Sequence, residues 1–168
     1  MMTEMKIASL PPGRSLTEPM TAIATVGGVG LLPLAPGSWG SLVALPFGWL
    51  IATTGGWPLL LAAAAIVSAI GWIAADRYVK ATGRDDPPEI VIDEVAAQWL
   101  AMTVVPMTAM GLIGAYFVFR LFDTFKPWPA SWADNELEGG AGVMLDDLIA
   151  GAYSLLPLVV LRLMGFLN

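Results

Sequence analysis

The sequence predicts an all-α fold: a small polytopic helical bundle in a membrane, built from two helical hairpins and a C-terminal helix, with a polar cap on the cytoplasmic side. The first observation is composition: 57% of the 168 residues are hydrophobic and 13% are charged, whereas a soluble domain has about 25% charged residues. The second is that all charged residues except Arg162 lie in three segments that precede or separate the apolar runs. A chain of this length is expected to form one domain.

The N-terminal residues are expected to lie outside the bundle. Residues 1–20 contain Pro-Pro and two glutamates but no apolar core, so they predict a short mobile extension rather than a cleaved signal peptide. The membrane-embedded domain is expected over residues 21–168. Its first part, "TVGGVGLLPLAPGSWGS" at 25–41, is rich in glycine and proline and predicts a loop or a broken helix.

Five apolar runs predict the positions of the helices. The hydrocarbon core of a bilayer needs about 20 helical residues, so the second and fifth runs are long enough to cross alone. Glycine or proline in "TTGGWP" and "VPMT" separates the first run from the second and the third from the fourth, which predicts the two hairpins. The five runs are Ser41–Thr53, Trp57–Ala75, Val95–Val105, Met107–Phe122 and Leu148–Leu167.

The distribution of charge predicts the orientation. All fourteen acidic residues and seven of the eight basic ones lie before Ser41, between Asp76 and Glu94, or between Arg120 and Asp147. If each hairpin crosses and returns, these segments share one side, which the positive-inside rule makes cytoplasmic. The seven basic residues are Lys6, Arg14, Arg77, Lys80, Arg84, Arg120 and Lys126. Arg162, near the far end of the last helix, is placed to snorkel to the opposite surface.

Composition also excludes several kinds of chemistry. The chain has no cysteine and no histidine, which excludes disulfides, thiolate nucleophiles and a histidine general base. The net charge of −6 argues against general binding of nucleic acid. Any reaction must therefore use carboxylates, lysine, arginine, hydroxyl groups or a hard cation.

Two pairs of acids precede apolar runs. Asp93 and Glu94 precede the third run, and Asp146 and Asp147 precede the fifth. In the first turn of a helix, carboxylates stabilise the helix dipole by about 0.3 to 1 kcal/mol each. Helix stabilisation is therefore the alternative to a functional role for each of these four residues.

Asp123 differs, because it lies at the C-terminal end of the fourth run, where a negative charge opposes the helix dipole. Arg120 and Lys126 lie three residues on either side of it. A local ion pair is the structural alternative. An exposed pair stabilises by only about 0 to 1 kcal/mol, so we interpret the triplet as functional.

The carboxylates at these three helix ends are expected to meet at one membrane surface. Gathered like charges repel unless a cation lies among them. Oxygen ligands alone favour Mg²⁺, with Mn²⁺ as a substitute, and these cations commonly bridge to a phosphate. Arg120 and Lys126 would then face the phosphate, and arginine is the better shaped for two-point contact.

Three sequence blocks resemble the phosphatidylglycerophosphatase A family. They are "LAPGSWGSL" at 34–42, "IVIDEVAAQW" at 90–99, and "FRLFDTFKPWPASWAD" at 119–134 continuing to "GGAGVMLDDLIAG" at 139–151. The resemblance implies Mg²⁺-dependent hydrolysis of phosphatidylglycerophosphate in the bilayer to phosphatidylglycerol and phosphate, at the bacterial cytoplasmic (inner) membrane. Two positions depart from the family pattern: Ala97 stands where glycine is usual, and Ser38 where threonine is common.

The resemblance also implies roles for the charged residues. By position, the family's acids fall on Asp93, Glu94, Asp123, Asp146 and Asp147. Of these, Asp93, Glu94, Asp146 and Asp147 are expected to bind metal. Asp123, Arg120 and Lys126 are expected to be catalytic, either around a metal-activated water or, alternatively, with Asp123 as the nucleophile that forms an aspartyl-phosphate.

The remaining candidates have weaker signals. Gly37 and Ser38 either form a structural turn or bind the phosphate at a helix start. The rings of Trp39, Trp128 and Trp132 are expected in an interfacial aromatic belt. Asp85, Asp86 and Glu89 are expected in a solvated loop, with Asp86 and Glu89 as reserve metal ligands.

Two other functions are possible from the composition. The first is a small membrane transporter or channel with a carboxylate ion site, although the five apolar runs contain no acid. The second is a lipid phosphotransferase, whose characteristic aspartate pattern is not found in the chain.

Overall fold

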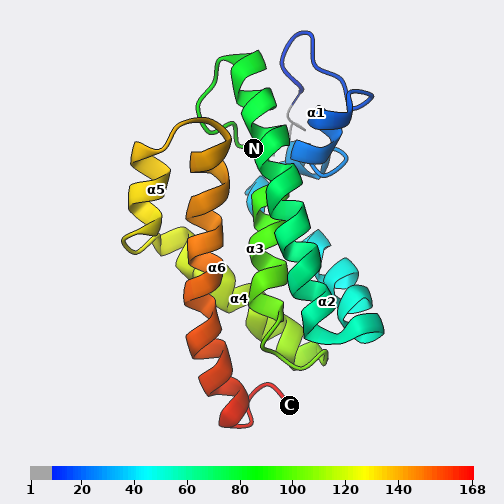
Figure 1. Ribbon diagram of the computed structural model, residues 1–168, viewed down its shortest axis with the longest axis vertical. Coiled ribbons are helices and arrows are strands. Elements are labelled where there is room, and N and C mark those ends of the chain that lie inside the picture. Colours follow the sequence, from blue (N-terminus) through cyan, green and yellow to red (C-terminus); the bar gives the residue numbers. More distant parts are fainter. Residues whose placement is uncertain (1–8) are drawn as a thin grey trace, which may run out of the picture.

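The computed structural model describes residues 9–168, and over that range the chain is helical and has no β-strand. The predicted extension at 1–20 falls partly on residues 1–8, which, with Lys6, lie outside the described residues. The elements are α1 (Pro19–Ala24), the 3-10 helix η1 (Val29–Leu31), α2 (Pro36–Thr82), α3 (Ile92–Met102), α4 (Ala109–Phe125), α5 (Ala130–Glu136) and α6 (Gly139–Leu163) (Figure 1).

Helix α2 contains both of the first two apolar runs, which a single residue interrupts. Gly56 has φ 70° and ψ −172°, a conformation that glycine adopts without steric cost. Gly48 lies against Met102 at the end of α3, whereas Gly71 lies against Ile92 at its start. Residues 36–55, here called the first segment of α2, therefore run beside α3 in its own direction, and residues 57–82, the second segment, run in the opposite direction.

The start of helix α3 lies beside the end of helix α4. Arg120, in the last two turns of α4, lies beside Glu94 in the first turn of α3. Helix α4 ends at Phe125 because Lys126 adopts a left-handed conformation, with φ 40°, and Pro127 follows it. Asp123 lies in the last turn of α4, as predicted, and Asp93 and Glu94 lie in the first turn of α3, as predicted.

Helix α6 corrects one prediction. It begins at Gly139, nine residues before the apolar run, so Asp146 and Asp147 lie about two turns inside it rather than in its first turn. The physical reason is packing: Gly140 lies directly against the backbone of the second segment of α2, near Trp72 and Asp76. The helix dipole acts mainly within the first turn, so it does not explain why these two acids are present.

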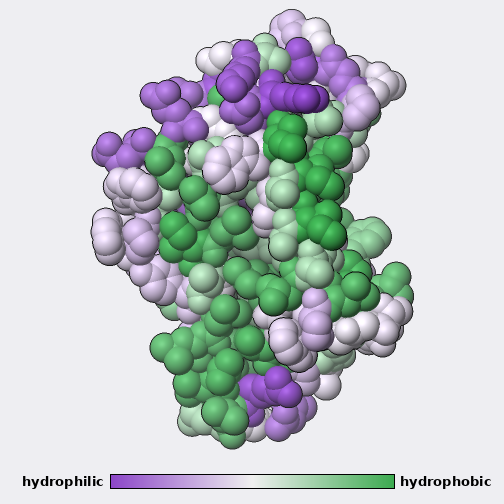
Figure 2. Space-filling model, viewed as in Figure 1, coloured by the Kyte–Doolittle hydropathy of each residue, from purple (hydrophilic) through white to green (hydrophobic). Residues whose placement is uncertain are grey.

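The surface of the bundle is strongly apolar. Helices α2 and α6 are each long and apolar enough to cross a membrane, and large hydrophobic side chains such as Phe117, Leu156 and Leu163 are 66 to 82% exposed. Figure 2 shows hydrophilic residues gathered at the upper end of the molecule and a mostly hydrophobic face below them. An apolar surface of this extent is typical of a protein that contacts lipid.

Candidate active site

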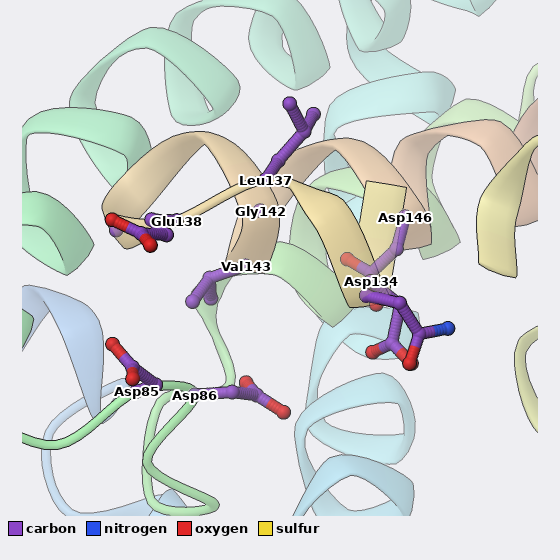
Figure 3. Close-up of a pocket in the computed structure, with 10 residues that line it drawn as sticks. Asp85, Asp86, Asp134, Leu137, Glu138, Gly142, Val143 and Asp146 are labelled. Atoms are coloured by element: carbon purple, nitrogen blue, oxygen red, sulfur yellow. The ribbon is translucent and has the colours of Figure 1, made fainter. Parts of the chain in front are cut away.

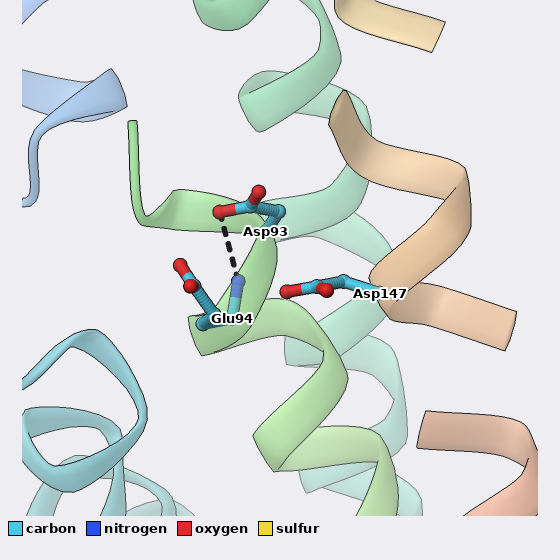
Figure 4. Close-up of side chains that lie close together, drawn as sticks. All are labelled: Asp93, Glu94 and Asp147. Atoms are coloured by element: carbon cyan, nitrogen blue, oxygen red, sulfur yellow. Dashed lines mark hydrogen bonds between the residues drawn. The ribbon is translucent and has the colours of Figure 1, made fainter. Parts of the chain in front are cut away.

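Three carboxylates from two helices form the centre of the site. One carboxylate oxygen from each of Asp93, Glu94 and Asp147 lies within 4.8 Å of the others. Asp93 and Asp147 are buried, and only 12% of the Glu94 side chain is exposed. The backbone N–H of Glu94 donates a hydrogen bond of 3.0 Å to Asp93 Oδ1 (Figure 4). We call these three residues the carboxylate cluster.

Arg120 and Asp123 adjoin this cluster from α4. Arg120 Nη1 lies 2.8 Å from Asp123 Oδ2 and 3.7 Å from Glu94 Oε1. The side chains of Arg120 and Asp123 are only 20% and 11% exposed, so this is not the exposed surface pair considered as the alternative. Asp123 is also an electrostatic neighbour of Asp147. Arg120 therefore connects Asp123 with the carboxylate cluster.

Lys126 does not join Arg120 and Asp123, so the predicted triplet separates into two groups. Its ammonium donates to Asp134 and, at 2.6 Å, to Asp146 Oδ2. Because α4 ends before Lys126, the side chain is free to turn toward α5 and α6. Burial lowers the pKa of Lys126, but the two hydrogen bonds outweigh burial and the pKa is raised above its usual value. Lys126 is therefore a fixed positive charge.

A pocket opens beside Asp146. It has a volume of about 200 Å³, and its acidic lining residues are Asp85, Asp86, Asp134, Glu138 and Asp146 (Figure 3). Burial raises the pKa of Asp86. Of the two reserve ligands, Asp86 lines this pocket, whereas Glu89 accepts hydrogen bonds from the Tyr78 hydroxyl and from Arg84. Glu89 thus ties the 83–91 loop to α2.

Gly37 touches the site, and Ser38 lies beside it. A Cβ atom at Gly37 would collide with Glu94 Oε1 and would lie 3.3 Å from Arg120 Nη1. The Ser38 carbonyl oxygen accepts a hydrogen bond of 3.4 Å from the Tyr116 hydroxyl. The absence of a side chain at Gly37 is what allows the start of α2 to lie directly on the Glu94 carboxylate.

The donor set fits a divalent cation. Buried oxygens of Glu94, Asp146 and Asp147 have no hydrogen-bond partner among residues 9–168. Burial and then the charge of Glu94 raise the pKa of Asp93 well above its usual value, and burial and then Asp147 do the same for Glu94. A cation offsets both burial and mutual repulsion, and carboxylate oxygens without nitrogen or sulfur ligands suit Mg²⁺ or Mn²⁺.

Two residues of this region were missed by the sequence analysis. Asp134 holds Lys126 but follows it by eight residues, and no local periodicity connects the two. Gln98 is fully buried in α3, and neither of its amide atoms has a partner in the described part of the chain. Its signal was present in the sequence: a polar amide inside an apolar run, four residues after Glu94.

Ala97, where the family usually has glycine, is fully buried and packs against Gly151 of α6. A Cβ atom at Gly151 would lie 3.0 Å from the Ala97 carbonyl oxygen and 3.3 Å from its Cβ. The extra methyl group on α3 thus faces a residue without a side chain on α6. This arrangement keeps the two helices that carry the carboxylate cluster close together.

The fold and site define a class of protein: an apolar helical enzyme that gathers carboxylates, an arginine and a lysine at one polar end, as expected of a lipid phosphatase. A family model described as Phosphatidylglycerophosphatase A matches residues 22–162. The chain therefore belongs to the phosphatidylglycerophosphatase A family, and it is an enzyme of the lipid phosphatase type.

Curated relatives agree with this family. Phosphatidylglycerophosphatase A of Escherichia coli is 36% identical over 140 residues, covering 83% of this chain and 81% of the relative. The protein of the same name from Haemophilus influenzae is 30% identical, covering 88% and 91%. A Bacteroides thetaiotaomicron protein, provisionally named a phosphatidylinositol-3-phosphatase, is 35% identical, covering 83% and 91%. No solved structure matches the chain.

The contact at Gly37 generates a prediction. Gly37→Ala is expected to displace the Glu94 carboxylate and to lower phosphate release from a lipid phosphomonoester by up to about 100-fold, because misplacement by about 1 Å has effects of that size. Ser68→Ala, at a residue whose hydroxyl donates to the Ala64 carbonyl oxygen within α2, is the control and is expected to retain most activity. Equal activity of the Gly37→Ala and unchanged proteins would show that Glu94 tolerates displacement.

Proposed function

We propose that this enzyme hydrolyses the terminal phosphomonoester of phosphatidylglycerophosphate to phosphatidylglycerol and phosphate, with Mg²⁺ as cofactor and Mn²⁺ as a substitute. The observation that carries the proposal is the carboxylate cluster, which lies beside Arg120 and in which Glu94 Oε2 and Asp147 Oδ2 are buried without a hydrogen-bond partner among residues 9–168. The names of the relatives from E. coli and H. influenzae support this substrate.

In this proposal Asp93, Glu94 and Asp147 hold the cation. Asp146 contributes through Oδ1, which is buried and has no hydrogen-bond partner in the described part of the chain, while its Oδ2 accepts from Lys126. When bound, Mg²⁺ supplies positive charge that polarises the phosphate and lowers the pKa of water. Without that charge the cluster would hold several buried acids that repel one another.

Arg120 and Lys126 bind and neutralise the phosphate. The Arg120 guanidinium lies between Glu94 and Asp123, and its planar fork offers donors to more than one phosphate oxygen. Lys126 stays protonated because Asp134 and Asp146 hold it. Both groups oppose the negative charge that develops as the phosphoryl group transfers.

Asp123 accepts the proton of the attacking water. The water oxygen forms a bond to phosphorus, the bond between phosphorus and the glycerol oxygen breaks, and that glycerol oxygen takes up a proton. Direct attack by Asp123 is the alternative. The sequence favours the water mechanism, because Asp123 is followed by Thr124 and Phe125 and so lacks the D-x-D pattern of the soluble aspartyl-phosphate phosphatases. A transporter is not favoured, since the named relatives are phosphatases.

The proposed orientation places the carboxylate cluster at the cytoplasmic surface of the inner membrane. Helices α2 and α6 cross the bilayer, and the two segments of α2 and the pair α3–α4 form the two hairpins. In this arrangement basic residues such as Arg77, Lys80 and Arg84 lie on the same side of the membrane as the carboxylate cluster, in agreement with the positive-inside rule. The exposed rings of Trp39, Trp128 and Trp132 would lie at the headgroup level.

The first prediction from this proposal concerns the metal. Because the site offers only oxygen ligands, phosphate release by the purified enzyme should stop in excess chelator and return with Mg²⁺ or Mn²⁺. The measurement is inorganic phosphate released from phosphatidylglycerophosphate in detergent micelles. Full turnover in excess chelator would overturn the metal proposal.

The second prediction concerns Asp123. Asp123→Asn keeps the size of the side chain and an acceptor for Arg120, so the thermal unfolding midpoint should change little. Activity should fall by at least about 100-fold, since loss of an electrostatic or acid–base group costs about 10² to 10⁴ in rate. Glu136→Gln, at an exposed acid near the end of α5, is the matched control. Near-normal activity of a folded Asp123→Asn protein would contradict the catalytic role. The Asp123–Arg120 ion pair of the unchanged protein would then be purely structural.

The third prediction tests the orientation. The chain has no native thiol, so single cysteines report accessibility directly. Asn135→Cys, exposed in α5, should react with an impermeant maleimide only from the cytoplasmic side of oriented vesicles. Thr54→Cys, exposed next to the interruption at Gly56, should react only from the opposite side. Labelling of both from one side would contradict the proposed crossing.

A further inference from the structure

Gln98 is a buried polar residue that the proposed chemistry leaves unused. Its relative exposure is 0%. Within residues 9–168, neither its amide oxygen nor its amide nitrogen has a hydrogen-bond partner. Burying an amide without partners costs about 1 to 3 kcal/mol. An apolar residue of similar size would avoid that cost, so packing alone does not explain a glutamine here.

The position of Gln98 on α3 relates it to the carboxylate cluster. It follows Glu94 by four residues, so the two side chains lie on adjacent turns of the same helix face. Val91 and Met102, also on this side of α3, contact Gly40 and Gly48 in the first segment of α2. Glu94 contacts Gly37 and Arg120. Gln98 is therefore buried on the face of α3 that packs on the first segment of α2, one helical turn after Glu94.

Glu94, four residues before Gln98 on that face, has a carboxylate oxygen with free hydrogen-bonding capacity. Glu94 Oε1 faces Arg120, at 3.7 Å, whereas Glu94 Oε2 is buried and has no partner in the described chain. The Gln98 amide nitrogen is a donor and Glu94 Oε2 is an acceptor. Because the donor and the acceptor lie on adjacent turns of one helix, a change of side-chain rotamer can form a hydrogen bond between them.

We propose that Gln98 is a positioning residue for the divalent cation: its amide N–H donates to Glu94 and orients that carboxylate when the cation binds. This inference rests on the proposed metal site. Carboxylates that bind a metal are commonly held by hydrogen bonds from a second layer of residues, and loss of such a partner typically weakens metal affinity about 10- to 100-fold. Complete burial keeps Gln98 from the substrate.

The test compares Mn²⁺ binding by the full-length purified protein with that of Gln98→Met, which keeps an unbranched side chain of similar length but cannot donate. The free Mn²⁺ signal in electron paramagnetic resonance gives the dissociation constant without turnover. Mn²⁺ affinity should fall about 10- to 100-fold. The thermal midpoint of the metal-free protein should stay equal or rise, since a buried amide without partners is removed. Turnover at saturating Mg²⁺ should approach that of the unchanged protein, because added metal compensates for weaker binding.

Met102→Leu is the matched control, because Met102 is fully buried on the same side of α3 and has no amide. Gln98→Leu is the second variant if Gln98→Met does not fold. Unchanged Mn²⁺ affinity in a folded Gln98 variant would overturn the proposal, as would an equal loss of affinity in Met102→Leu, which would mark a packing effect. Failure of the unchanged protein to bind Mn²⁺ would instead overturn the proposed metal site.

Discussion

The charge of carboxylates buried at one end of an apolar bundle is the constraint on which the rest of the structure depends. Asp93, Glu94 and Asp147 place three acids within 4.8 Å of one another. Repulsion between like charges is strong where water is scarce. The guanidinium of Arg120 partly offsets this repulsion, Lys126 pairs with the neighbouring Asp146, and a divalent cation completes the compensation in the proposed function. Stability and catalysis thus make opposite demands on the same residues.

The geometry of these acids depends on close contacts between helices. Gly37, Gly40 and Gly48 let the first segment of α2 lie directly on α3, and Gly151 lets α6 approach Ala97. Small residues are the usual means of bringing helices together in lipid, where no hydrophobic effect drives the helices against one another. The carboxylates on α3 and α6 are separated by only a few ångströms. The glycines therefore contribute to the site without bearing any reactive group.

Much of the candidate site was predictable from residue chemistry. Asp93, Glu94, Asp123 and Arg120 stood out because charges are rare in this chain and cluster at the ends of apolar runs. The partner of Lys126 was not predictable in this way, because helix α4 ends at Phe125 and the lysine turns toward α5 and α6. The start of α6 was also misplaced, since "GGAGVML" has low intrinsic helix propensity and is helical here because Gly140 packs on α2.

The sequence by itself determined the class of fold and the chemistry available: the apolar runs predict helices, and the absence of cysteine and histidine leaves carboxylates, arginine, lysine, hydroxyl groups or a hard cation for any reaction. Only the tertiary structure decided which acids meet. It brought Asp93 and Glu94 close to Asp147, paired Asp146 with Lys126, and buried Gln98 completely. The physical reason is that periodicity and capping act within a few residues, whereas these contacts join positions 20 or more residues apart, or depend on burial between helices.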